Sequence, residues 1–153
     1  ELDLSNQTDG ITGPISKDLW RFQSLKIFNL AGNKLTSIVP PSIGSMSVLE
    51  VLDLSNNDLE SSIPSELGML GGTLKRLGLV NNSLSGIIPS QIGQLRGAAV
   101  LLKGNLNLFH NSSFAPLSLC LEREVKVFDL ANDTTLCPIE RNALSDFYDS
   151  AKG

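Results

Sequence analysis

The chain is poor in the side chains that catalysis and metal binding use most often. Its 153 residues include one histidine, two cysteines, one tryptophan and one tyrosine. Two cysteines and one histidine are too few for a closed zinc site. The histidine, His110, has no nucleophile placed beside it, so we interpret it as a surface residue and not as a general base. We therefore predict that the protein is not an enzyme and that it has no catalytic residues, no metal and no cofactor.

Positive charge and long apolar runs are also scarce. Twelve Lys and Arg residues face 16 Asp and Glu residues, and the net charge is -4. Nucleic-acid binding requires a basic stripe that neutralises phosphates, and the sequence offers none. No apolar run reaches the roughly 20 residues of a membrane-spanning helix, and the start lacks the pattern of a signal peptide. We expect no nucleic-acid partner and no membrane span in this chain, as in a mature or trimmed form.

What the sequence does contain is a repeat of 24 or 25 residues. The units that start at Leu25, Leu49 and Leu74 each continue with an apolar-x-apolar pair, an asparagine, a leucine two residues later and a Val-Pro or Ile-Pro pair. The two residues of an apolar pair point to the same side of an extended strand, so each unit sends both into one interior. A fixed period of this kind predicts a solenoid whose stacked coils share one core.

The repeat predicts parallel strands and an asparagine ladder. The asparagines recur at one phase, at Asn33, Asn57 and Asn82, where a side-chain amide can donate to the backbone of the neighbouring coil. After Leu95 the register slips by one residue, so Asn105 is the asparagine of the fifth coil. The predicted strands are Leu2–Leu4, Phe28–Leu30, Leu52–Leu54, Leu77–Leu79 and Val100–Leu102.

These motifs resemble the plant-type leucine-rich repeat, whose consensus is L-x-x-L-x-L-x-x-N-x-L-x-G-x-I-P-x-x-L-G-x-L. Gln7 replaces the asparagine of the first coil, and Ser37 and Ser61 stand where the family usually has glycine. The resemblance implies an α/β leucine-rich repeat solenoid of about five coils, with a parallel β-sheet on its concave face and a disulfide-containing carboxyl-terminal cap. We therefore assign residues 1–105 to the array, 106–136 to the cap and 137–153 to a separate helix.

The two cysteines, Cys120 and Cys137, lie beyond the repeats. An even count in a secreted-looking chain suggests a disulfide between them, and the alternative is a bridge from Cys137 to another module. The alternation over residues 124–130 predicts a last strand that covers the core. Residues 137–153 carry the pattern C-x-x-E-R-x-A-L-x-x-F, which resembles the helix that opens an amino-terminal cap in this family.

Four N-glycosylation sequons indicate the compartment. They begin at Asn6, Asn81, Asn111 and Asn132. Together with the cysteine pair, they favour an extracellular protein, secreted or on the cell surface, that carries N-linked glycans.

The two ends of the chain predict self-association. The sequence begins inside the first predicted strand, so the first coil should expose apolar side chains that the helix of another copy or tandem module could cover. The alternative is that this helix folds back on its own last coil. The residues of the predicted contact are Leu2, Leu4, Ile15 and Phe22 on the first coil and Ile139, Leu144 and Phe147 on the helix.

The concave strand face is where the family usually binds partners. Two of its columns are Asp3, Asn29, Asp53, Gly78, Leu101 and Ser5, Ala31, Ser55, Val80, Lys103. They lack an aromatic anchor and the flat ladder that ice binding requires. Asn6 and Asn81 share a further column with Gly32, Asn56 and Gly104, so glycans there would shade the face. We therefore predict a structural, self-associating module. The alternative is a fragment of a receptor or inhibitor ectodomain that recognises a protein or peptide.

Overall fold

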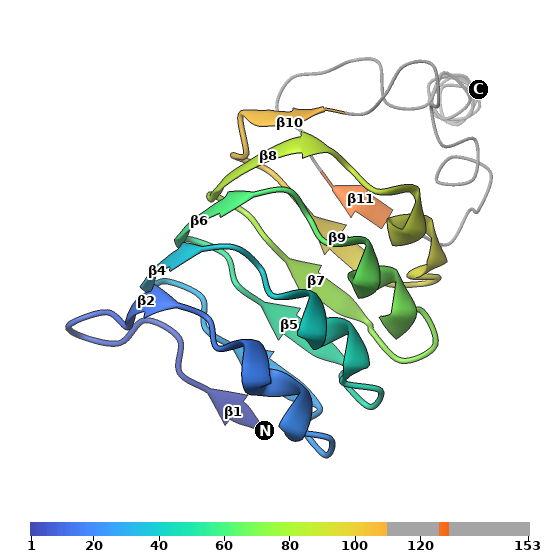
Figure 1. The fold of residues 1–153 in the computed structure, drawn as a ribbon, viewed down its shortest axis with the longest axis horizontal. Helices are drawn as coiled ribbons and strands as arrows, with labels where there is room; N and C mark the ends of the chain where they lie inside the picture. The colour runs from blue at the N-terminus through green and yellow to red at the C-terminus, as the bar shows by residue number, and fades with distance from the viewer. Residues whose placement is uncertain (110–125, 129–153) are drawn as a thin grey trace, which may run out of the picture.

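The computed structural model describes residues 1–109 and 126–128 of the 153-residue chain. In these residues the backbone winds into stacked coils that contribute strands to two parallel sheets (Figure 1). The strand order is β1-β3-β5-β7-β9-β11 in the first sheet and β10-β8-β6-β4-β2 in the second. The predicted solenoid with a parallel sheet is therefore present.

The first sheet follows the predicted coil phase. Its strands are β1 Leu2–Asp3, β3 Ile27–Asn29, β5 Val51–Asp53, β7 Arg76–Gly78, β9 Ala99–Leu101 and β11 Lys126–Phe128. Phe28 pairs with Leu52, which pairs with Leu77, which in turn pairs with Val100. This register confirms the one-residue slip after Leu95. Strand β11 pairs with β9 and lies within the segment where the last strand was predicted. The number of coils stays a prediction, since much of the chain after residue 109 is outside the described residues.

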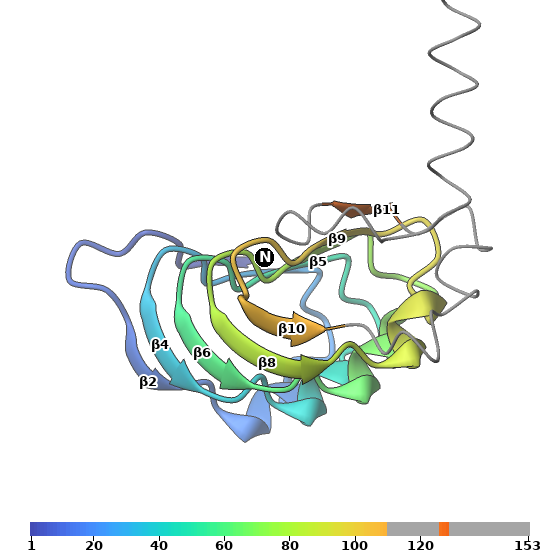
Figure 2. The ribbon, with the colours of Figure 1, turned by 90° about the horizontal axis from the view of Figure 1, so that it is seen from above.

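The second sheet and a series of short 3-10 helices, four in the described residues, complete the coils. The strands are β2 Thr12–Pro14, β4 Lys34–Ser37, β6 Asp58–Ser61, β8 Ser83–Ile87 and β10 Asn107–Phe109. The helices are η1 Lys17–Arg21, η2 Pro41–Ser45, η3 Ser65–Leu70 and η4 Ser90–Gln94. Pro40, Pro64 and Pro89 cap the last three helices. Seen along the stack in Figure 2, the two sheets and the helices enclose one interior.

Leucines and asparagines fill this interior together. Leu52, Leu54, Leu77 and Leu79 are fully buried, as the apolar pairs predict. Asn57 is 6% exposed, and its Oδ1 accepts a hydrogen bond from the N–H of Leu35 in the preceding coil at 3.0 Å. Its Nδ2 donates to the carbonyl of Leu30 in the preceding coil and to that of Leu54 in its own coil, both at 3.0 Å.

The same bonds recur at each coil junction. Asn33, Asn82 and Asn105 are also buried, and each accepts from a backbone N–H and donates to a carbonyl of the preceding coil. The predicted ladder is therefore confirmed, and its asparagines act as acceptors as well as donors. In the first coil, Gln7 donates instead to the carbonyl of Ser5 at 3.2 Å.

The two serines at the usual glycine position adopt a glycine-like backbone. Ser37 and Ser61, the last residues of β4 and β6, have φ angles of 69° and 72°, in the same left-handed region as Gly13 in β2 and Gly86 in β8. The left-handed region costs an L-residue roughly 1–2 kcal/mol. The departure from the family pattern therefore leaves the turn geometry intact but strains two residues.

The first coil exposes less apolar surface than we expected. Ile15 and Leu19 are buried, at 8% and 7% exposure. Leu2 and Leu4 are partly buried and pack against the core. Phe22 is the clear exception, because it is 53% exposed.

The remaining predictions fall outside the described residues. They concern the cap beyond Phe109, apart from β11, and the helix 137–153 with all side chains assigned to it. The residues involved are His110, Asn111, Cys120, Asn132, Cys137, Ile139, Leu144 and Phe147.

Candidate binding face

The outward side of the first sheet presents regular columns of side chains, and we call it the first-sheet face. Residues that alternate with the buried leucines along a strand point outward. This places the predicted columns outside. The strand register adds a fourth column that was not predicted, made of Ile27, Val51, Arg76 and Ala99. Ile27 and Val51 are only partly buried, so two neighbouring coils offer apolar surface here.

Three polar side chains of the column that begins at Asp3 turn back onto their own backbone. The Oδ1 atoms of Asp3, Asn29 and Asp53 each accept a hydrogen bond from the N–H two residues later, at 3.0 to 3.1 Å. The N–H and hydroxyl of Ser5 stabilise the Asp3 carboxylate and lower its pKa. A Cβ at Gly78 would lie against the carboxylate of Asp53, so glycine lets this carboxylate keep its present position. These groups therefore fix the strand ends and are less available to a ligand than their exposure suggests.

Charged residues of three coils form ion pairs beside the strand starts, where Arg76 also reaches back to Asp53 at the end of β5. We call Lys26, Glu50, Asp53, Lys75 and Arg76 the charged cluster. The carboxylate of Glu50 pairs with Lys26 Nζ at 3.0 Å and with Lys75 Nζ. Arg76 Nη2 lies 3.3 Å from Asp53 Oδ2. The bond from Lys75, followed by that from Lys26, lowers the pKa of Glu50 to about 2. Three cations face two carboxylates, so the cluster is locally positive on an acidic chain.

The opposite margin of the face is a column of left-handed turn residues, which we call the turn-side column. It consists of Asn6, Gly32, Asn56, Asn81 and Gly104, with φ angles between 49° and 80°. Asn81 Nδ2 donates to Asn56 Oδ1 in the preceding coil at 2.8 Å. The structure thus brings these residues together as predicted, and places them at the end of the strands.

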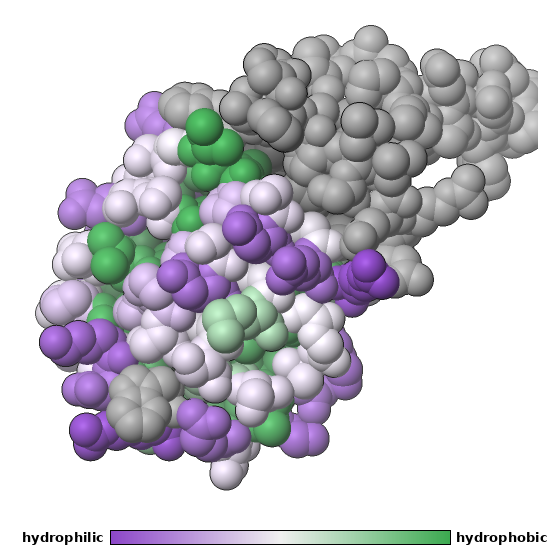
Figure 3. Space-filling view, turned by 45° about the vertical axis from the view of Figure 1, so that its right-hand side comes forward, coloured by the Kyte–Doolittle hydropathy of each residue, from purple (hydrophilic) through white to green (hydrophobic). Residues whose placement is uncertain are grey.

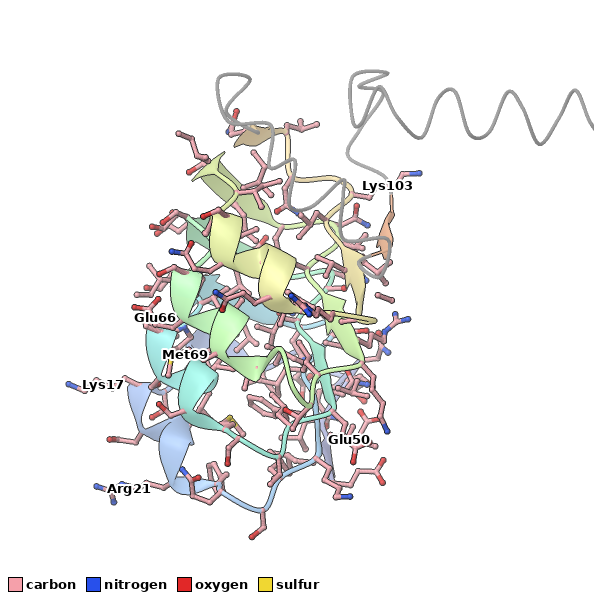
Figure 4. All side chains as sticks on the ribbon, turned by 90° about the vertical axis from the view of Figure 1, so that its right-hand side faces the viewer. Lys17, Arg21, Glu50, Glu66, Met69 and Lys103 are labelled. Carbon is pink, nitrogen blue, oxygen red and sulfur yellow. The ribbon has the colours of Figure 1, made fainter. Side chains whose placement is uncertain are left out.

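The other side of the array differs in character. Figure 4 shows Glu50 on the side away from Glu66 and Met69 on the 3-10 helices. Figure 3 shows that the surface over these helices is mostly polar with separate apolar patches. A hollow of about 400 Å³ lies here, where Ser62 occupies the position of Ile38 and Ile87 in the adjacent coils. This hollow was not predicted from the sequence.

The described residues contain no group of three or more His, Cys, Asp or Glu side chains placed to hold a metal ion. Within the same ranges, every helix falls short of the length and hydropathy that a bilayer crossing requires. Among the surfaces described above, the first-sheet face combines regular columns of side chains with the charged cluster, and it is the candidate binding face.

Comparison with known families identifies the repeats. The family described as "Leucine Rich repeats (2 copies)" matches residues 23–67, and the family described as "Leucine Rich Repeat" matches residues 73–95. No curated protein sequence matches the chain.

Two solved structures illustrate what the chain is similar to. A chain in the crystal structure of PEPR1-AtPEP1 is 30% identical, with a TM-score of 0.70 over 80% of this chain and 17% of its own. The Arabidopsis receptor kinase HAESA, in complex with the peptide hormone IDA and the co-receptor SERK1, is 36% identical, with a TM-score of 0.60 over 71% of this chain and 19% of its own.

A third similar structure is described as an ectodomain. The ectodomain of the plant membrane receptor kinase GASSHO1/SCHENGEN3 from Arabidopsis thaliana, in complex with CASPARIAN STRIP INTEGRITY FACTOR 2, is 38% identical, with a TM-score of 0.56 over 58% of this chain. The chain spans 11% to 19% of the length of these three proteins. The matched repeats, the buried asparagine ladder and these similarities together identify the repeated units of this chain as leucine-rich repeats.

Proposed function

We propose that this chain is a non-catalytic, extracellular recognition module that binds a protein or peptide on its first-sheet face. The observation that supports this most strongly is its similarity to two plant receptor kinases solved with bound partners: HAESA, in complex with the peptide hormone IDA, and GASSHO1/SCHENGEN3, in complex with CASPARIAN STRIP INTEGRITY FACTOR 2. This similarity favours recognition over the structural role that the sequence alone led us to prefer.

The chemistry of the face supports the proposal. Ile27 and Val51 provide adjacent apolar contacts, and Arg76 lies beside Val51 in the strand register. Apolar contact area with a few directional polar groups is the usual composition of a protein interface. The local positive charge of the cluster favours a partner with acidic groups.

Selection of peptides provides a direct test. A phage-displayed library of random peptides is selected on the purified chain, and each clone is then measured against Val51→Arg and Ser45→Arg. Val51→Arg alters the first-sheet face, whereas Ser45→Arg alters an exposed helix residue on the other side. We expect Val51→Arg to abolish binding of the selected clones and Ser45→Arg to leave it unchanged. A selection without binding clones, or clones sensitive only to Ser45→Arg, would contradict the proposal.

Self-association is the second candidate, and Phe22 is the observation that favours it. This exposed aromatic ring lies on the first coil, where β1 and β2 each pair with one neighbouring strand among the described residues. Light scattering of the purified chain and of Phe22→Asp measures it. Self-association predicts oligomers for the first protein and monomers for the second, and a monomeric parent chain would exclude this role.

A further inference from the structure

The turn-side column has the geometry of an exposed attachment site for sugars. Asn6 and Asn81 begin sequons, and both side chains are exposed. Their φ angles are 49° and 51°, in a region that asparagine and glycine adopt more readily than other residues. The two sequons therefore lie at positions where the fold itself requires a residue of this kind.

The neighbouring coils leave room for these side chains. A Cβ at Gly32 would collide with the carboxamide of Asn6, and a Cβ at Gly104 would collide with that of Asn81. Glycine at these two positions thus accommodates the asparagine of the preceding coil. The hydrogen bond from Asn81 Nδ2 to Asn56 needs one of two hydrogens, so a glycosylated Asn81 retains a hydrogen for it.

We infer that Asn6 and Asn81 carry N-glycans that close the turn side of the first-sheet face. The acidic protein or peptide of the proposed function then docks across the charged cluster at the other margin. The inference rests on the extracellular location in the proposed function. In the attachment step, Nδ2 bonds to the anomeric carbon of a lipid-linked oligosaccharide diphosphate. The bond from that carbon to the diphosphate oxygen breaks, the diphosphate leaves and Nδ2 loses one proton.

The dimensions of the sheet separate the two margins. Asn81 follows Arg76 by five residue steps of nearly extended backbone, which corresponds to about 16 Å at roughly 3.3 Å per residue. Asn6 and Asn81 lie three coils apart, or about 14 Å at the usual strand spacing of roughly 4.8 Å. Glycans at these two points border one long margin of the array and leave the charged cluster open.

Asn56 provides a matched control within the same column. It is exposed and has a φ angle of 56°, but Asp58 stands where a sequon requires Ser or Thr. The substitution Asp58→Ser places a serine two residues after Asn56 and thereby completes a sequon at an exposed strand position. This variant tests whether the column accepts a glycan independently of the natural sequons.

The first experiment maps glycans on the chain secreted from a eukaryotic cell line. Peptide N-glycosidase in ¹⁸O-water converts each glycosylated asparagine to labelled aspartate, which peptide mass spectrometry detects. We expect label at Asn6 and Asn81, none at Asn56 in the parent chain, and label at Asn56 in Asp58→Ser. Unlabelled Asn6 and Asn81 would overturn the inference, whether or not Asn56 of the variant is labelled.

The second experiment tests the shielding. Ala31→Cys lies beside the turn-side column, and Lys26→Cys lies in the charged cluster. Each variant reacts with a bulky polyethylene-glycol maleimide before and after enzymatic deglycosylation. The parent chain, treated in the same way, gives the background labelling of Cys120 and Cys137. We expect deglycosylation to raise the rate several-fold for Ala31→Cys and to leave Lys26→Cys unchanged. Equal effects at both positions, or none at Ala31→Cys, would overturn the shielding.

The outcome is separable from the proposed function. When the peptide selection is carried out on unglycosylated chain produced in bacteria, recognition can hold although Asn6 and Asn81 carry no sugar. Conversely, mapped glycans on these two residues would support the inference even if the selection gave no binding clone.

Discussion

Replacing Asn57 by alanine removes one rung of the asparagine ladder, and the structure allows its cost to be worked out. The carbonyls of Leu30 and Leu54 keep the side-chain amides of Asn33 and Asn82, at 2.9 and 3.0 Å. The N–H of Leu35 loses the acceptor that it has at 3.0 Å. A buried N–H without a partner costs about 1–3 kcal/mol, and the lost packing adds to it, so we expect a loss of about 2–3 kcal/mol.

Urea denaturation followed by circular dichroism measures this loss, with Asn56→Gly as the control. Asn56 is the preceding residue but is exposed, and its φ angle of 56° suits glycine. We expect the control to change the free energy of unfolding by less than about 0.5 kcal/mol, the usual range for surface substitutions. Equal losses for Asn57→Ala and Asn56→Gly would refute the reasoning, because the buried hydrogen bonds of Asn57 would then add nothing to the free energy of unfolding.

Asn57→Asp tests the donor half of the same rung. The variant keeps an acceptor for Leu35 but places a buried carboxylate against the carbonyls of Leu30 and Leu54. Burial and these carbonyls should raise the pKa of the new carboxyl above its unfolded value of about 3.9. The stability of the variant relative to the parent chain should therefore be highest below about pH 3.9 and fall as the pH rises through the folded pKa. A stability difference that does not change with pH would contradict this.

Three further predictions concern the core, a turn and the charged cluster. Leu54→Ala should lower the free energy of unfolding by about 2–5 kcal/mol, because Leu54 is fully buried. Met69→Ala alters a side chain that is 69% exposed and should lower it by less than about 0.5 kcal/mol in the same assay. Similar losses for the two variants would contradict the core assignment. Ser61→Gly should raise the melting temperature, because it relieves left-handed strain of roughly 1–2 kcal/mol. This gain exceeds the entropic cost of the more flexible unfolded chain, and the net stabilisation is about 0.5 kcal/mol. A lower melting temperature would contradict this. Carbon-13 NMR titration should give Glu50 a pKa of about 2, and Lys75→Ala should raise this pKa towards 4.5. In the parent chain, the stabilisation from the lowered pKa of Glu50 should be present above the unfolded pKa and disappear as the pH falls through the folded pKa. An unchanged pKa of Glu50 in the variant would contradict the pairing.

The periodicity of the sequence was sufficient to predict the core and the register of the first sheet. Leucines such as Leu52 and Leu77 recur at a spacing that only stacked coils explain, and the asparagines identify the junctions. The second sheet was not predicted because β4, β6 and β8 each bury a single residue, so no repeated apolar-x-apolar pair marks these strands. The 3-10 helices were missed for a similar reason, since segments of five or six residues show no helical period.

The candidate site was predicted in part. The turn-side column follows from the repeat phase alone, but the column of Ile27, Val51 and Arg76 was overlooked, although it has the same spacing as the others. The bonds that turn Asp53 back to its own backbone depend on local geometry, which residue identity does not specify. Burial of Ile15 in the first coil likewise depends on how closely the second coil packs against it.

The asparagine ladder also bears on how arrays of this kind change in length. Each coil brings the one asparagine that its junction with the preceding coil requires, as Asn82 does for Leu59. Duplication or loss of a whole coil therefore adds or removes one buried N–H and its acceptor together. Loss of part of a coil separates the two and carries the cost of an unpaired buried donor. Selection for stability alone would then favour arrays that differ by complete repeats, whatever their partners are.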